Sequence, residues 1–172
     1  WFLRRLSFGA AWLVRARLLI YDYLGDVKLY QDWFDRQDAS AEVHGEKSRV
    51  AIRRRVVRAL VHMACEVEAR QLDGYFIVAH SLGTVVTFNG IMEHEQVLAN
   101  YLSSEEWATL PTQFKAKVSA ALPPTPVAPA RPPWLVPEDA INRAALFRGL
   151  RGVLTLGSPL NKFATLWPAL VP

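Results

Sequence analysis

Apolar residues recur at helical spacing in the first part of the chain. From Ala16 they follow at steps of four, three, four, three and four residues, ending at Phe34, which predicts a helix over residues 16–34 with one apolar face. The polar residues 36–45 predict a loop. A second apolar stripe predicts a helix over residues 48–71, with its arginines on the opposite, solvated face; the stripe consists of Val57, Leu60, Val61, Ala64 and Val67.

Two short uncharged runs, residues 75–79 and 152–156, predict strands. They are rich in aromatic, aliphatic and β-branched residues, which is typical of strands buried on both faces in a parallel sheet. Asp73-Gly74 indicates a turn before the first run. After it we expect a helix over residues 84–98, then a short helix capped at Ser103, and a further helix over residues 138–147.

The order helix, helix, strand, helix, helix, strand predicts an α/β fold, a three-layer sandwich with a mostly parallel sheet. At 172 residues the chain has room for one domain. Residues 123–137 carry seven prolines, which exclude a helix or a central strand. We expect this segment to be a surface loop or insertion within the domain.

Composition and charge narrow the class of protein. Apolar residues make up 51% of the chain and charged residues 21%, as in a globular domain. The single cysteine, Cys65, excludes an internal disulfide and a zinc site built on paired cysteines. No apolar run reaches the roughly 18 residues of a transmembrane helix, and no signal-peptide cleavage site follows an apolar stretch. We therefore expect a cytoplasmic or peripheral membrane location rather than secretion.

The formal net charge of +4 raises the question of a nucleic-acid partner. The excess lies in the basic residues between Lys47 and Arg58, and no aromatic residues alternate with them to stack on bases. We predict no nucleic-acid partner.

The chemistry is concentrated where the first predicted strand meets the next helix. A serine nucleophile has to be lifted clear of its surroundings by a tight strand-to-helix turn with strained backbone angles. Small residues two positions before and after it let strand and helix crowd together, and Ala79 and Gly83 flank Ser81 in this way. The backbone N–H of Leu82 would then point beside the hydroxyl and could stabilise an oxyanion.

Ala79-His80-Ser81-Leu82-Gly83 resembles the nucleophile elbow of the α/β-hydrolase superfamily, in its lipase and esterase branch, with Ala79 in place of the first glycine of G-x-S-x-G. Residues 154–160 resemble the strand that follows the elbow helix in these proteins. The resemblance implies a serine hydrolase that forms an acyl-enzyme on Ser81, with Leu82 as one oxyanion donor. Its substrate would be a small-molecule or lipid carboxylic ester, and it would need no metal or organic cofactor.

The partners of such a serine are not identifiable in this chain. In the superfamily an acid and then a histidine follow the serine, each after a later strand. His94 follows Ser81 by only 13 residues, in the helix that leads away from it, and His80 and His62 are expected to have packing roles. Glu138 and Asp139 are expected to open a helix, where the helix dipole favours acids.

A second oxyanion donor is also missing. His44-Gly45 has the residue types of such a loop but lies too close to Ser81 in sequence. We therefore expect residues 1–172 to form a partial α/β-hydrolase domain, inactive as a fragment, with early strands before Trp1 and the acid and base after Pro172.

Other interpretations stay open. Ser81 could simply end a strand, and the domain could be a non-catalytic scaffold of the same fold that binds a partner. A peripheral membrane protein docking through its basic helix and aromatic N-terminus is a third hypothesis, compatible with lipase activity. Nucleotide binding is disfavoured, because the turn has neither G-x-G-x-x-G nor a G-K-[ST] ending. The oligomeric state is not indicated.

Overall fold

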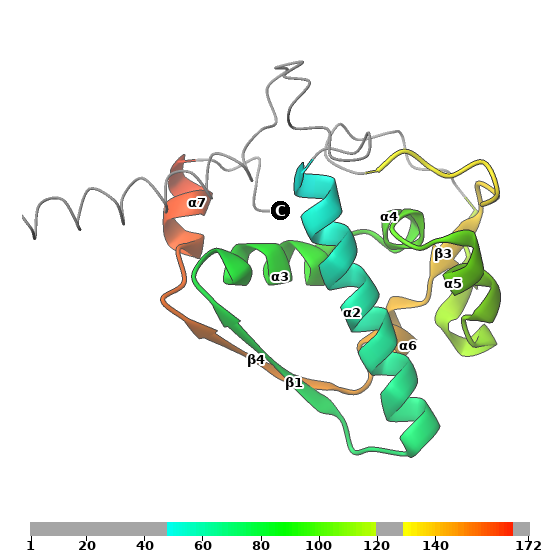
Figure 1. Ribbon diagram of the computed structural model, residues 1–172, viewed down its shortest axis with the longest axis horizontal. Coiled ribbons are helices and arrows are strands. Elements are labelled where there is room, and N and C mark those ends of the chain that lie inside the picture. The colour runs from blue at the N-terminus through cyan, green and yellow to red at the C-terminus, as the bar shows by residue number, and fades with distance from the viewer. Residues whose placement is uncertain (1–47, 120–128, 167–172) are drawn as a thin grey trace, which may run out of the picture.

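The computed structural model describes residues 48–119 and 129–166 of the chain (Figure 1). The helix expected over residues 16–34, the loop over residues 36–45 and His44-Gly45 lie outside the described residues. In chain order the elements are α2 (Ser48–Arg70), β1 (Tyr75–His80), α3 (Leu82–Met92), α4 (Glu95–Asn100), α5 (Ser104–Thr109), η2 (Thr112–Phe114), β2 (Lys115–Lys117), β3 (Asp139–Ile141), α6 (Arg143–Leu146), β4 (Leu150–Leu156) and α7 (Leu160–Leu166).

The long helix α2 confirms the prediction from its apolar stripe. Every member of the stripe is buried, at 9% exposure or less. The helix ends at Arg70, and Gln71 adopts a positive φ of 53°. There the N–H of Leu72 donates to the carbonyl of Val67, and the N–H of Gln71 donates to that of Glu68, which satisfies the last carbonyls of the helix.

The expected solvated arginine face of α2 is wrong for the first turns of the helix. Arg49 and Arg53, one turn apart, are 4% and 6% exposed. Arg53 donates to the Glu93 carboxylate at 3.0 Å, and Arg54 donates to the carbonyl oxygen of Tyr101 at 2.6 Å. These partners lie about 40 residues away in sequence, so the local pattern could not reveal them. The guanidinium groups are structural links between α2 and the chain around α4.

Strands β1 and β4 pair in parallel, as the two apolar runs predicted. Ile77 lies opposite Val153, and His80 opposite Leu156. The chain also turns at Asp73-Gly74 before β1. Only glycine fits at Gly74, because a Cβ there would lie 2.4 Å from the carbonyl oxygen of Gly149. The fold is therefore mixed α/β, with a parallel pair of strands among the described residues.

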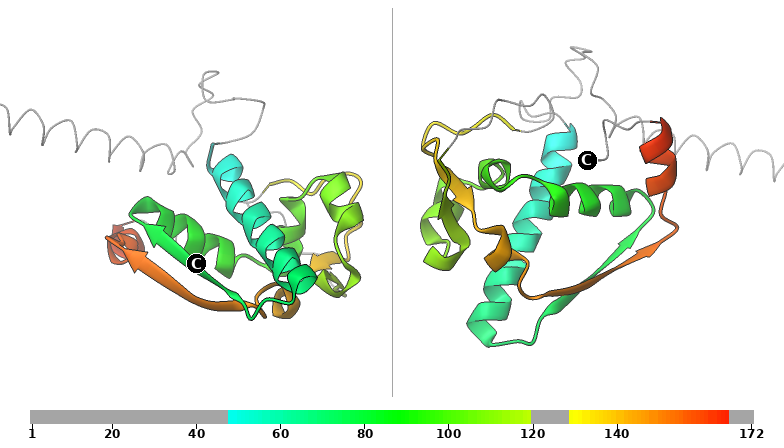
Figure 2. Two further views of the ribbon diagram at one scale, coloured as in Figure 1. Left: turned by 60° about the horizontal axis from the view of Figure 1, so that its bottom comes forward. Right: turned by 180° about the vertical axis from the view of Figure 1, so that it is seen from behind.

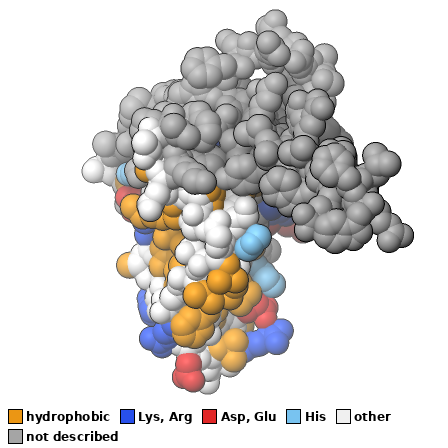
Figure 3. Space-filling view, turned by 90° about the vertical axis from the view of Figure 1, so that its left-hand side faces the viewer, with side chains coloured by type: hydrophobic (Ala, Val, Ile, Leu, Met, Phe, Trp, Pro, Cys, Tyr) orange, Lys and Arg blue, Asp and Glu red, His pale blue; other side chains and the backbone are white. Residues whose placement is uncertain are grey.

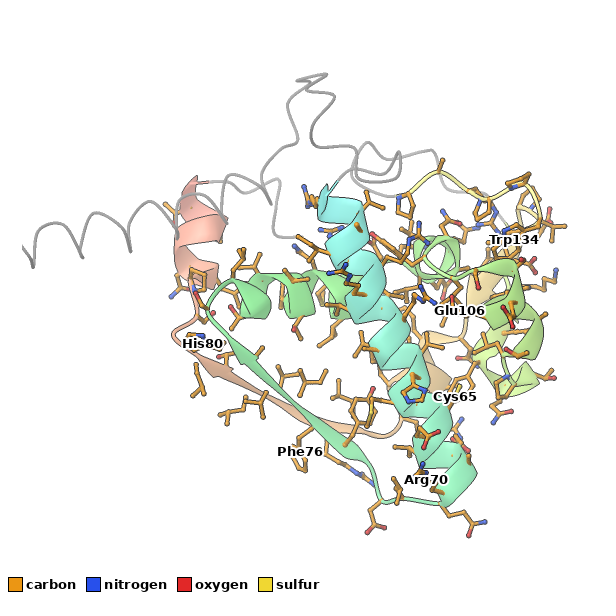
Figure 4. The ribbon with its side chains drawn as sticks, in the orientation of Figure 1. Cys65, Arg70, Phe76, His80, Glu106 and Trp134 are labelled. Carbon is orange, nitrogen blue, oxygen red and sulfur yellow. The ribbon has the colours of Figure 1, made fainter. Side chains whose placement is uncertain are left out.

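Helices α2 and α3 lie on one side of the β1–β4 pair (Figures 1 and 2). Leu60 and Val67 of α2 pack there against Tyr75. Burial of both faces is not found within the described residues, because Phe76 is 73% exposed and Val78 is 66% exposed. Phe76 projects from β1 away from α2 and α3 (Figure 4). Hydrophobic side chains also gather into a patch on the side of the molecule drawn in Figure 3.

The single helix expected over residues 84–98 is divided into α3 and α4. The backbone is extended at Glu93 and His94, where ψ is 145° at both residues. Arg143 donates to the carbonyl oxygens of Ile91 and Glu93, and the Tyr101 hydroxyl donates to the Glu93 carboxylate at 3.2 Å. Burial, with the nearby Glu93 carboxylate as a second cause, raises the pKa of Tyr101. The break is thus stabilised by partners distant in sequence rather than by a local helix breaker.

A further correction concerns residues 138–147, which were expected to form one helix. Their first part is β3, which pairs antiparallel with β2, a strand that the sequence analysis missed. The carboxylate of Asp139 lies 2.6 Å from Lys117 Nζ across this pair. Only the short helix α6 follows, begun by Asn142, whose side-chain oxygen accepts from the N–H of Ala145 at 3.2 Å.

The proline-rich segment is described only over residues 129–137. These residues form no helix or strand, as predicted, and Leu135 is buried in the main core. That core lies between α2, α4, η2, β3 and α6; its most completely buried large side chains are Tyr101, Phe114, Leu98, Leu102, Ile141 and Leu146.

Candidate active site

The junction of β1 and α3 has the sharp turn that the sequence analysis expected around Ser81. Strand β1 ends at His80 and α3 begins at Leu82, so Ser81 alone links them. Its φ of 50° and ψ of −128° lie outside the regions that a residue with a Cβ normally occupies. Only Ser81 and Gln71 have a positive φ among the non-glycine residues in the described ranges.

This backbone conformation carries a cost that the surrounding bonds must offset. A residue held in such a sparsely populated region costs on the order of 1–3 kcal/mol. The N–H of Ser81 donates to the carbonyl of Leu156 on β4 at 2.9 Å, and its own carbonyl accepts from the N–H of Thr84 at 3.0 Å. The Ser81 side chain makes no capping hydrogen bond to α3. The hydroxyl is therefore not used to stabilise the turn that presents it.

Leu82 stands where an oxyanion donor would be needed. It is the first residue of α3, and the first N–H groups of a helix have no acceptor within the helix. The helix has 11 residues, and its dipole places partial positive charge at this end. A negative charge that develops beside the Ser81 hydroxyl would therefore be stabilised by this helix terminus.

The two small residues of the motif have different surroundings. Ala79 is buried and lies opposite Thr155 in the parallel pair. Gly83 is exposed, and a Cβ built on it would have no atom of the described residues within 4 Å. The crowding expected at Gly83 is therefore not found in the part of the chain that the structure describes.

His80 lies at the carboxyl end of β1, next to the turn that follows β4 (Figure 4). A Cβ built on Gly157 would lie 3.6 Å from its Nε2 atom. Gly157 has a φ of 57°, so this turn also needs a residue without a side chain. His80 itself is exposed, so the packing role expected for it is not found among the described residues.

The other histidines take structural or solvent-facing positions. His94 begins α4, where its Nδ1 accepts from the N–H of Gln96 at 3.4 Å, so it is a capping residue rather than one within a surface helix. His62 is exposed on α2, which corrects the expectation that it sits among the apolar positions. Among the described residues, no hydrogen bond joins Ser81 Oγ to a histidine or a carboxylate.

The two acids after Ser81 do not open a helix, as had been expected. Glu138 is exposed just before β3, and Asp139 lies within it. Asp139 is engaged by Lys117, and its carboxylate also accepts from the N–H of Val136 at 3.2 Å. Asp139 is therefore unsuited to orient a base for Ser81, because its carboxylate is already bound by Lys117 and by the N–H of Val136.

Two hydroxyl groups that the sequence pattern did not indicate also belong to the turn. Thr84 Oγ1 lies 2.7 Å from the Ser81 carbonyl oxygen and 2.9 Å from Ser158 Oγ. Thr84 stands three residues after the serine, a spacing typical of hydroxyl contacts at a helix start, which is the one local signal for it. Ser158 follows β4, and nothing in the sequence relates it to Ser81.

The described residues contain no group of three or more histidine, cysteine, aspartate or glutamate side chains that could hold a metal ion. No helix in the described ranges combines the length and apolar character needed to cross a membrane. Comparisons of the chain with family models, curated proteins and solved structures found no match.

Proposed function

We propose that this chain carries the nucleophile elbow of a serine hydrolase that acts on carboxylic esters, with Ser81 as the nucleophile. The observation that supports it most is the backbone of Ser81, held at a φ of 50° between a parallel strand and a helix. A serine that only ends a strand or caps a helix needs no such conformation. Active-site residues are where strain of this kind is concentrated.

The chemistry follows from the placement of the groups. Ser81 Oγ attacks the acyl carbon while its proton passes to a general base, and the carbonyl electron pair moves to the oxygen. The Leu82 N–H donates to this oxyanion until the carbonyl re-forms and the alcohol leaves with a proton, giving an acyl-enzyme. Water then hydrolyses the acyl-enzyme. The general base, its orienting acid and a second oxyanion donor are not among the described residues.

The parallel pair would then be part of a larger sheet with helices on both faces. Four apolar side chains on its uncovered face support this, since Phe76, Val78, Leu154 and Leu156 are half to three-quarters exposed. Burying a large apolar side chain fully contributes about 1.5–3 kcal/mol, so covering these four would contribute on the order of 5 kcal/mol. A second helix layer supplies that cover in a three-layer sandwich.

The test is covalent labelling of the full-length protein that contains this chain. A fluorophosphonate probe reacts with an activated serine, so we expect labelling of the wild type and none of Ser81→Ala. Ser104→Ala changes an exposed serine of α5 and serves as the matched control, with labelling expected at the wild-type level. Labelling that persists in Ser81→Ala would exclude Ser81 as the nucleophile. No labelling of the wild type would favour a non-catalytic scaffold of this fold.

A further inference from the structure

A chain of hydroxyl groups connects the carbonyl of Ser81 to the turn after β4. Thr84 Oγ1 donates to the Ser81 carbonyl oxygen at 2.7 Å. Because that proton is committed, Ser158 Oγ must be the donor in its 2.9 Å bond to Thr84 Oγ1. Ser158 Oγ in turn accepts from the N–H of Leu160 at 3.3 Å. The bonds run in one direction, from the start of α7 to the candidate nucleophile.

These bonds hold a residue whose backbone is strained. Thr84 is 1% exposed, so water does not compete for its hydroxyl. The N–H of Ser81 is held from the other side by the carbonyl of Leu156. Both backbone polar groups of Ser81 are thus linked to β4 or to the turn that follows it.

The position of the Ser81 carbonyl decides where the candidate oxyanion donor points. The carbonyl of Ser81 and the N–H of Leu82 belong to the same planar trans peptide group, so neither can rotate without the other. Fixing the carbonyl oxygen therefore fixes the direction of the Leu82 N–H. An oxyanion donor is effective only when it is aimed in advance at the position where the charge develops.

We propose that Thr84 and Ser158 are positioning residues for the reaction, which aim the Leu82 N–H by holding the peptide group between Ser81 and Leu82. This inference rests on the proposed serine-hydrolase function. Thr84 acts directly on the carbonyl, and Ser158 acts through Thr84. Neither hydroxyl contacts the reacting atoms.

The experiment measures fluorophosphonate labelling of the full-length protein over a range of probe concentrations, which separates the maximal labelling rate from probe affinity. Thr84→Val keeps the side-chain volume and removes the hydroxyl. Losing a whole oxyanion donor costs about 100-fold or more, so misaiming one should lower the maximal rate about tenfold, with probe affinity unchanged. Thr84→Ser keeps the hydroxyl and should restore the rate. Ser158→Ala should lower it several-fold, and the double variant should be no slower than Thr84→Val.

Thr109→Val is the matched control, because Thr109 Oγ1 donates to a helical carbonyl, that of Glu105, at 2.9 Å on α5. It should label as the wild type does. A wild-type maximal rate in Thr84→Val, or a change in probe affinity alone, would overturn the inference while the proposed function stands. If Thr84→Val does not fold, the exposed Ser158 decides, and an unchanged rate in Ser158→Ala overturns the inference. A wild type that does not label refutes the proposed function, and this inference with it.

Discussion

Replacing Ser81 by glycine should make the protein more stable, whereas replacing it by alanine should leave stability nearly unchanged. The φ and ψ of Ser81 are close to the mirror image of the extended region, which glycine occupies as readily as extended backbone itself. Serine and alanine both carry a Cβ and are strained there. Ser81→Ala also loses no capping hydrogen bond, since the hydroxyl makes none.

The size of the effect follows from two opposing terms. Relief of the strain contributes about 1–3 kcal/mol. The greater freedom of glycine in the unfolded chain costs about 0.5–1 kcal/mol. Ser81→Gly should therefore raise the free energy of unfolding by up to about 2.5 kcal/mol, while Ser81→Ala stays within about 0.5 kcal/mol of the wild type. For a chain of this length, each kcal/mol corresponds to about 2–4 °C in Tm.

Urea unfolding followed by circular dichroism measures these differences directly. Ala59→Gly is the control, because Ala59 is exposed in the middle of α2 and should lose about 1 kcal/mol on conversion to glycine. Substitution by glycine should therefore raise the free energy of unfolding at Ser81 and lower it at Ala59. If Ser81→Gly is no more stable than Ser81→Ala, Ser81 is not strained, and the main support for a nucleophile elbow is lost.

Two further predictions concern charged and titratable groups. Glu93→Leu deprives the buried Arg53 of a carboxylate and should lower the free energy of unfolding by about 3–5 kcal/mol. In urea unfolding, the double variant Arg53→Met/Glu93→Leu should lose less stability than Glu93→Leu alone. Additive losses would contradict this coupling. Burial raises the pKa of the Cys65 thiol, and the nearby carboxylates of Glu66 and Glu68 raise it further. Iodoacetamide should therefore alkylate Cys65 more slowly at pH 8 than it alkylates a cysteine in an unstructured peptide. Glu66→Gln should speed this reaction. Because the folded chain holds the thiol proton more tightly, this contribution to stability is complete below pH 9.0 and is lost as the pH rises above it; alkylation at the peptide rate would disprove the shift.

The elements predicted correctly from the sequence are those with a long apolar pattern or with all their signals within a few neighbouring residues. The stripe of α2 fixed its buried side, and the two uncharged runs identified β1 and β4. The tight turn at Ser81 was predicted because a strand, a small residue and a helix meet there within a few positions. In each case the information that determines the structure lies within the segment itself.

The features that the sequence did not predict depend on residues far away in the chain. Arg53 is buried because it pairs with Glu93, which lies 40 residues later in the chain. The helix after Ser81 ends where Arg143 donates to the carbonyl of Glu93. Asp139 lies in a strand because β2 pairs with it. A local pattern assigns arginines to solvent and acids to helix starts, and only the folded chain shows that their partners lie elsewhere.

The conformation of the candidate site depends both on the local sequence and on contacts with residues far away in the chain. A tight turn can be written into five residues, but those residues alone would relax, because the strained backbone of Ser81 is unfavourable by itself. The bonds that oppose this relaxation come from Thr84, just after the motif, and from Leu156 and Ser158, more than 70 residues later in the chain. The geometry of Ser81 therefore depends on β4 as well as on β1 and the start of α3.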